Sequence, residues 1–179
     1  TLYGISRFDG YTFRNYRTLP GDYSPLSHNR FLNIREDAAG YLWITSYDNR
    51  LYRFDRHNET FTDVPGSIAG FAGQEYKVGR FLSSSRADTW IDIAGHGLIL
   101  SSTPDAQGNT RIVNYIGNPN IGRQIELIFE DSTGRIFVVS EVGLTLFVAD
   151  AASTDGYKAS LISRQKGITA VAEAAGKVY

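Results

Sequence analysis

The 179-residue chain contains no cysteine, and this absence excludes disulfide bonds, a thiol nucleophile and cysteine-ligated metal sites. It also lacks any run of about 18 apolar residues, so the sequence predicts no membrane-spanning helix within it. Neither sign of charge is in excess, because 18 Lys and Arg residues stand against 19 Asp and Glu residues. A net charge of −1 gives no electrostatic basis for contact with nucleic acid or with an anionic membrane surface.

No window of the sequence shows a convincing helical stripe of apolar residues. Instead, short runs rich in β-branched and aromatic residues alternate between two faces and stop at Gly, Asp, Asn, Ser or Pro. The clearest region predicts four strands, at residues 30–35, 41–46, 51–55 and 60–64. With 42% hydrophobic residues, the chain has ample apolar surface for the core of an all-β fold.

These strands belong to a repeat of about 47 residues. From Gly40 to Gly134 is 94 residues, or two periods, and Trp90 lies 47 residues after Trp43 and 47 before Phe137. Pairs of glycine and an apolar residue follow the aromatic positions at Gly4, Gly97 and Gly143, and Arg50 occupies this position in one unit. Four short antiparallel strands in each unit of 40 to 50 residues are typical of a propeller blade.

The repeat predicts that residues 1–179 are part of one β-propeller domain built of four-stranded antiparallel blades. Because the chain starts and stops inside a repeat and about three blades cannot close a ring, we expect it to be a piece of a longer protein. The expected blades are residues 1–18 (the end of a blade), 26–65, 77–116, 121–165 and 168–179 (the start of a blade). The region 168–175 fits the repeat as a strand.

Two features recur within the units. Asp37 and Gly40, like Asp131 and Gly134, have the spacing of a tight turn in which the Asp accepts backbone hydrogen bonds and the Gly takes positive φ. A large aromatic residue follows, and its position favours packing between neighbouring blades. The aromatic residues at this position are Trp43, Trp90, Phe137 and Tyr179.

The segment from Gly4 to Phe13 resembles the opening of the two-component regulator propeller repeat family. So do residues 26–37, Gly40-Tyr-Leu-Trp-Ile-Thr45 and Leu51-Tyr-Arg-Phe-Asp55. The resemblance covers the whole chain and is closest in residues 1–64 and 119–147. In the middle unit, residues 83–88 differ from the acidic turn that the other units have at this place.

This resemblance implies a sensor region of a Bacteroidetes-type hybrid two-component system. Members of the family usually carry seven blades per ring in the periplasm, followed by a membrane helix and a histidine kinase. We therefore expect a periplasmic, membrane-anchored sensor that binds an oligosaccharide and signals to a kinase. The partners expected are the remaining blades, the following domains of the same chain and a second copy in a homodimer.

The sequence predicts no catalytic residue, no metal site and no cofactor. The three histidines lack the spacing of a metal pair, and there is no Gly-x-Ser-x-Gly elbow or phosphate loop. The carboxylate pair at residues 36–37 recurs at 130–131, which favours turn chemistry over acid–base catalysis. Two alternatives stay open: a carbohydrate-active propeller enzyme, either a lyase or a glycosidase, and a propeller that binds a protein partner.

Functional residues of a propeller are expected in loops held by the rigid sheets. On one face these loops are residues 20–30, 46–50, 70–77, 94–96, 118–124 and 141. Tyr47-Asp-Asn-Arg50 combines an aromatic ring, an amide and a guanidinium group, a combination that suits a sugar. The candidate ligand-binding residues are His28, Arg30, Tyr47, Asp48, Asn49, Arg50, Tyr76, Lys77, His96 and Arg123.

Overall fold

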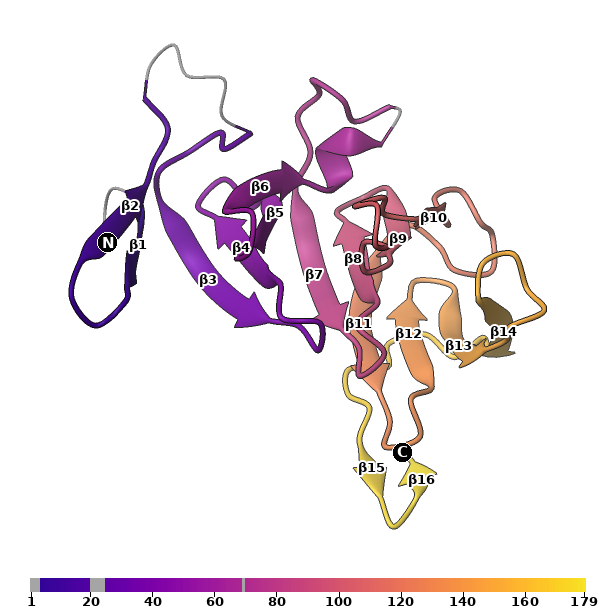
Figure 1. Ribbon diagram of the computed structural model, residues 1–179. Helices are drawn as coiled ribbons and strands as arrows, with labels where there is room; N and C mark the ends of the chain where they lie inside the picture. The colour runs from indigo at the N-terminus through magenta and orange to yellow at the C-terminus, as the bar shows by residue number, and fades with distance from the viewer. Residues whose placement is uncertain (1–3, 20–24, 69) are drawn as a thin grey trace. The chain divides into compact units, whose positions relative to one another are not determined.

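The computed structural model describes residues 4–19, 25–68 and 70–179, and their regular secondary structure is almost entirely β-strand (Figure 1). The chain divides into two compact units, Thr1–Lys77 and Val78–Tyr179. In the described part, a 3₁₀ turn at Pro65–Ser67 (η1) is the only helical element. The predicted all-β class, with four-stranded antiparallel sheets of the propeller-blade type, is confirmed. The assignment of the whole chain to one domain stays a prediction.

The first unit holds a two-stranded and a four-stranded sheet. The small sheet pairs β1 (Ile5–Phe8) with β2 (Phe13–Tyr16). The larger sheet has the order β3-β4-β5-β6, with each strand antiparallel to the next. Its strands are β3 (Phe31–Glu36), β4 (Leu42–Ser46), β5 (Leu51–Asp55) and β6 (Thr60–Asp63), within about a residue of the predicted ranges.

The second unit holds two four-stranded sheets and a hairpin. The first sheet consists of β7 (Val78–Ser83), β8 (Thr89–Ile93), β9 (Gly97–Ser101) and β10 (Ile112–Asn114). The second consists of β11 (Ile125–Glu130), β12 (Ile136–Ser140), β13 (Gly143–Ala149) and β14 (Tyr157–Ser163). The hairpin pairs β15 (Glu173–Ala174) with β16 (Lys177–Val178).

The predicted Asp–Gly turn joins β3 to β4. One carboxylate oxygen of Asp37 accepts the N–H groups of Ala39 and Tyr41, both at 2.9 Å, and Gly40 has φ +87°. The second oxygen accepts the ring Nε1–H of Trp43 at 2.8 Å, a bond that the sequence did not predict. The turn aspartate therefore also holds the large aromatic residue of its own sheet.

The turn between β7 and β8 has the same backbone shape without the Asp or the Gly. Ser84 occupies the Asp position, and Ala87 takes the left-handed conformation with φ +63°. Trp90 is fully buried, and in the part of the chain that the structure describes its Nε1–H has no hydrogen-bond partner. The sheet thus keeps the turn but loses the ring bond that Trp43 makes.

Apolar side chains between the two larger sheets of the second unit form its core. Trp90 lies 4.7 Å from the ring of Phe147 and 4.9 Å from that of Tyr157, both from the following sheet. The predicted packing of the repeat aromatics between sheets is confirmed at this position. The members of the core are Trp90, Leu98, Leu100, Tyr115, Ile121, Ile125, Ile136, Val138, Phe147 and Tyr157.

Tyr179 does not follow the burial pattern of the other repeat aromatics. Trp43 and Phe137 are 1% and 4% exposed, whereas Tyr179 is 71% exposed. The expected strand at 168–175 is also shorter, since β15 covers Glu173–Ala174 only. Among the described residues, β15 and β16 pair only with each other.

A glutamate in the first strand of a sheet or hairpin links it to the preceding sheet at two places in the second unit. Glu130 accepts the backbone N–H of Ser85 at 2.8 Å and its hydroxyl at 2.6 Å. Glu173 accepts the same two groups of Ser132, each at 2.6 Å. Asp131 accepts hydrogen bonds within its own turn, as predicted, whereas the adjacent Glu130 binds the turn of the preceding sheet.

Asp92 on β8 is a buried carboxyl group, 3% exposed. The corresponding repeat positions hold Thr45 and Val139. Burial raises the pKa of Asp92 to about 6, although the charge of Arg80 and a hydrogen bond from its N–H oppose the rise. Ionised Asp92 therefore weakens the fold at neutral pH.

We expect Asp92→Thr to raise the free energy of unfolding by about 1–2 kcal/mol at pH 7.5. Because the folded pKa lies above the ordinary value of 3.8, the carboxyl group costs nothing below that value. The cost grows as pH rises from about 4 to about 6 and is constant above that range. Urea unfolding of both proteins at pH 4 and 7.5 measures this, and an equal difference at the two pH values would contradict it.

Candidate functional site

The turn between β4 and β5 forms the centre of the candidate site. Its backbone is fixed by the Asn49 N–H, which donates to Ser46 O at 3.0 Å, and Asn49 itself has φ +60°. The Tyr47 N–H donates to Arg30 O at 2.8 Å and so ties the turn to the segment before β3. Asn and Asp tolerate the left-handed conformation better than other non-glycine residues, which explains the local sequence.

Three of the predicted residues form a stack on this turn. The guanidinium carbon of Arg30 lies 4.1 Å from the ring centroid of Tyr47, in cation–π geometry. The ring of His28 lies 6.1 Å from that of Tyr47, and His28 Nδ1 accepts the Arg30 N–H at 2.9 Å. Tyr47 remains 53% exposed. The stack is thus both ordered and accessible.

Arg50 has its donors engaged within the protein. Its Nη1 lies 3.1 Å from Asp63 Oδ2, and its Nη2 donates to Gln74 O at 3.1 Å. Its guanidinium carbon lies 4.7 Å from the ring centroid of Tyr76, whose hydroxyl donates to Asp63. Burial and the Asp63 carboxylate raise the pKa of Tyr76 far above its usual value, so the hydroxyl stays protonated. Arg50 and Tyr76 are therefore held in place by contacts within the protein and stabilise the turn between β4 and β5.

Asp48 is held by hydroxyl groups. It accepts the Ser27 hydroxyl at 2.7 Å and the Ser46 hydroxyl at 2.5 Å, and Arg50 Nε lies 3.9 Å away. Burial opposes ionisation, but the bonds from Ser46 and Ser27 outweigh it and hold the pKa of Asp48 below its ordinary value. Ser27 also donates its N–H to the Tyr52 hydroxyl at 2.9 Å, which links the segment before β3 to β5.

The structure brings seven of the ten predicted residues into one connected rim and leaves three apart. Lys77 is exposed at the end of the first unit. His96 and Arg123 belong to the second unit, on the β8–β9 and β10–β11 connections, where the Arg123 N–H donates to Glu141 at 2.7 Å. The rim consists of His28, Arg30, Tyr47, Asp48, Asn49, Arg50 and Tyr76. Of the predicted loop 20–30, residues 20–24 lie outside the described residues.

Sequence reasoning missed the residues that support the rim. Asp63 and Gln74 hold the Arg50 guanidinium group, and Ser27, Ser46 and Tyr52 hold Asp48 and the segment before β3. No motif marks them, because each is an ordinary polar residue near a strand end. Only the pairing of strands that are distant in sequence shows their role.

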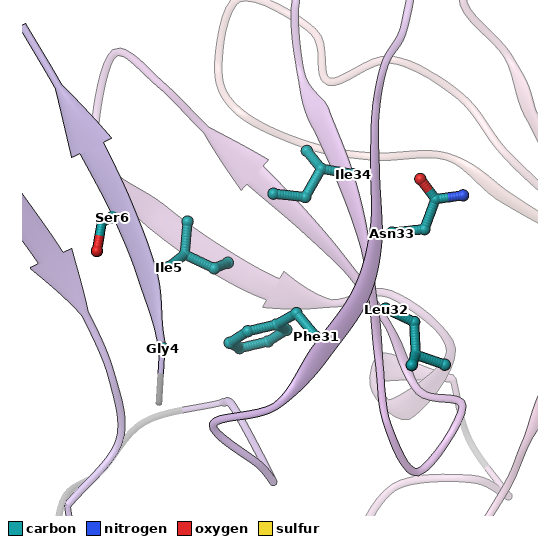
Figure 2. A pocket seen from close by; sticks show the side chains of 7 residues that line it. All are labelled: Gly4, Ile5, Ser6, Phe31, Leu32, Asn33 and Ile34. Carbon is teal, nitrogen blue, oxygen red and sulfur yellow. The ribbon is translucent and has the colours of Figure 1, made fainter. Parts of the chain in front are cut away.

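A cavity of about 340 Å³ lies elsewhere in the first unit, between β1 and β3. Figure 2 shows the Ile5 and Phe31 side chains in the space between these strands. The residues that line it are Gly4, Ile5, Ser6, Phe31, Leu32, Asn33 and Ile34. None of the rim side chains lines this cavity, and its lining lacks a guanidinium group beside an aromatic ring, the chemistry predicted for a sugar.

No helix within the described ranges is long and apolar enough to cross a membrane. Over residues 4–19, 25–68 and 70–179, no group of three or more His, Asp or Glu side chains is placed to hold one metal ion. The rim itself offers hydrogen-bonding groups, the exposed ring of Tyr47 and the exposed guanidinium group of Arg30.

Comparison with known proteins connects this rim to a family. Residues 25–48, which include β3, β4 and most of the rim, match the family model described as the two component regulator propeller. The match lies within this one unit and agrees with the resemblance seen in the sequence. No curated protein matches the chain.

Solved structures to which the chain is similar include extracellular domains of B. thetaiotaomicron proteins. The extracellular domain of the hybrid two component system BT4673 matches with a TM-score of 0.52 and 18% identity, over 96% of this chain and 24% of that chain. A second structure, described as the extracellular domain of the one component system BT4673, matches with a TM-score of 0.50 and 17% identity, over 87% and 21%. The extracellular domain of BT3049 matches with a TM-score of 0.48 and 19% identity, over 82% and 18%.

The two BT4673 matches support the propeller fold of the chain. Its length is about a quarter or less of theirs.

Proposed function

We propose, from the propeller repeat at residues 25–48, that the chain is part of the extracytoplasmic sensor region of a two-component regulator and that its rim binds an oligosaccharide. One observation carries the ligand part of this proposal: Tyr47 is exposed, yet its ring lies against the Arg30 guanidinium group and near the His28 ring. An ordered aromatic ring beside hydrogen-bonding groups is a common platform for a sugar ring.

The proposed output is a change in packing. Ligand contacts on the rim would favour one arrangement of the blades, of the following domains or of a homodimer, and a histidine kinase in the full-length, membrane-anchored, periplasmic protein would respond. No catalysis is proposed for this region. The carboxylates of Asp48 in the rim and of Asp63 beside it support this, because both are engaged by neighbouring side chains.

Calorimetric titration of the purified chain against a panel of oligosaccharides tests the proposal. We expect at least one to bind, and we expect Tyr47→Ala to weaken that binding about tenfold because it removes the ring. His57→Ala is the matched control, because His57 is an exposed aromatic residue on the β5–β6 turn at the opposite end of the sheet. No binding across the panel, or equal effects of the two variants, would overturn the proposal.

A further inference from the structure

We infer that Arg30 in the His28–Arg30–Tyr47 stack binds an acidic group, so that the oligosaccharide taken by the rim carries a carboxylate or a sulfate. This inference rests on the proposed function and goes beyond it by naming the chemical class of the ligand. It follows from the charges at the rim, the order of the stack and the residues found at the same positions of the other repeats.

The first observation is that the two rim arginines differ in their partners. Arg50 is paired with Asp63 at 3.1 Å and is bonded to Gln74 O. Arg30 is exposed, and no carboxylate in the described part of the chain lies within ion-pair distance of it. The Asp48 carboxylate accepts two serine hydroxyls and lies 3.9 Å from Arg50 Nε. The rim therefore presents one guanidinium group, that of Arg30, with no described carboxylate at ion-pair distance.

The second observation is that this guanidinium group is preorganised. Tyr47 lies against it at 4.1 Å, and the Tyr47 N–H fixes the Arg30 carbonyl group. His28 fixes the Arg30 N–H through Nδ1, which leaves Nε2 as the protonated nitrogen of the neutral ring and hence a donor. A held arginine loses less side-chain entropy on binding than a free one, and its planar fork matches a carboxylate or sulfate.

The third observation is that the fold does not require these residues. Counting by the 47-residue repeat, the Arg30 position holds Lys77 and Gln124, and the Tyr47 position holds Ala94 and Glu141. The β7–β10 and β11–β14 sheets form with these residues in place. An arginine and a tyrosine therefore occur together at these two repeat positions in the β3–β6 sheet but not in the β7–β10 or β11–β14 sheet.

The experiment uses two hexasaccharides with the same backbone: oligogalacturonate and its carboxyl-reduced, neutral form. A chondroitin sulfate hexasaccharide provides the sulfate case. Each is titrated into the intact chain, into Arg30→Gln and Arg30→Lys, and into the control Arg56→Gln. The control removes one exposed positive charge that pairs with Glu36 at 2.5 Å near the β5–β6 turn.

We expect at least one acidic hexasaccharide to bind at least about tenfold more tightly than the neutral one, and the preference to weaken as salt increases. Arg30→Gln should remove this preference, Arg30→Lys should retain part of it, and Arg56→Gln should leave it unchanged. Circular dichroism of each variant checks that the sheets are intact.

The outcomes separate this inference from the proposed function. Equal binding of acidic and neutral sugars, or an acidic preference that survives Arg30→Gln, overturns the inference and leaves the proposed function standing. If neither these sugars nor the wider panel binds, both fail together. A loss of preference that is as large in Arg56→Gln points to net charge alone and also overturns the inference.

Discussion

Replacing Asp37 with alanine is expected to lower the free energy of unfolding of the first unit by about 3–4 kcal/mol. Asp37 is 7% exposed and accepts three hydrogen bonds, from the N–H groups of Ala39 and Tyr41 and from the ring of Trp43. Alanine leaves all three donors without this acceptor, of which the ring N–H of Trp43 is buried and the two backbone N–H groups are partly buried. Each unsatisfied buried donor costs about 1–3 kcal/mol, and partial relaxation keeps the total below the sum.

The chain offers its own reporter for this measurement. It contains two tryptophans, Trp43 in the first unit and Trp90 in the second. In a Trp90→Phe background, fluorescence during urea unfolding follows the surroundings of Trp43 alone. The free energy obtained with and without the Asp37 substitution gives the effect directly.

A matched series tests the ring bond separately from the turn. Asp37→Asn keeps an acceptor for the turn N–H groups but places an amide N–H against the ring N–H of Trp43, so we expect about half of the loss. With Trp43→Phe in the same chain, read by circular dichroism, Asp37→Asn should cost less than it does beside tryptophan. If the cost is the same with both rings, the bond at 2.8 Å is not the source of the stability.

Gly143→Ala is expected to destabilise the second unit by more than about 3 kcal/mol. Gly143 has φ +131°, and a Cβ atom added there would lie 2.0 Å from the carbonyl oxygen of Ser163 and 2.9 Å from Arg164 Cα. Both atoms belong to the backbone, so no side chain can rotate away. The start of β13 would have to separate from β14, which pairs with it from Leu144 onward.

Gly95→Ala is the control for backbone conformation alone. Gly95 also has positive φ, at +77°, but a Cβ atom there meets nothing within 4 Å. We expect a loss of about 1 kcal/mol, the ordinary cost of placing alanine in the left-handed region. Urea unfolding followed through Trp90, which packs on Phe147 of β13, measures both variants. Equal losses would show that the contact with Ser163 is not what the glycine serves.

A close backbone carbonyl oxygen also explains why glycine recurs at this position of the repeat and why the β3–β6 sheet is the exception. At Gly4 and Gly97 an added Cβ atom would lie 2.6 Å and 2.9 Å from a carbonyl oxygen of a neighbouring segment. In the β3–β6 sheet, Asn49 takes the positive φ in the turn, at +60°, and the following position is free to carry Arg50. In the other units the close carbonyl oxygen excludes any side chain at this position. Here a side chain fits, and it helps to hold the rim.

The sequence by itself determined the period, the strand order within each sheet and the Asp–Gly turns. These features depend on interactions between residues close in the chain, such as the bonds of Asp37 to Ala39 and Tyr41, and local chemistry is written directly in local sequence. The sequence also marked Tyr47 and Arg50 as unusual among the repeats. It had no means of separating a guanidinium group engaged by the protein from one left for a ligand.

Only the tertiary structure decided that difference. Arg50 is held by Asp63 and Gln74, residues 13 and 24 positions further along the chain, while Arg30 rests on Tyr47 without a described carboxylate beside it. Likewise, Glu130 reaches Ser85 across 45 positions, although its sequence neighbour Asp131 suggested a turn role for both. Contacts of this kind arise where strands from different parts of the chain are brought together by burial of their apolar faces. The side chains that meet there depend on register and packing, which no single segment encodes.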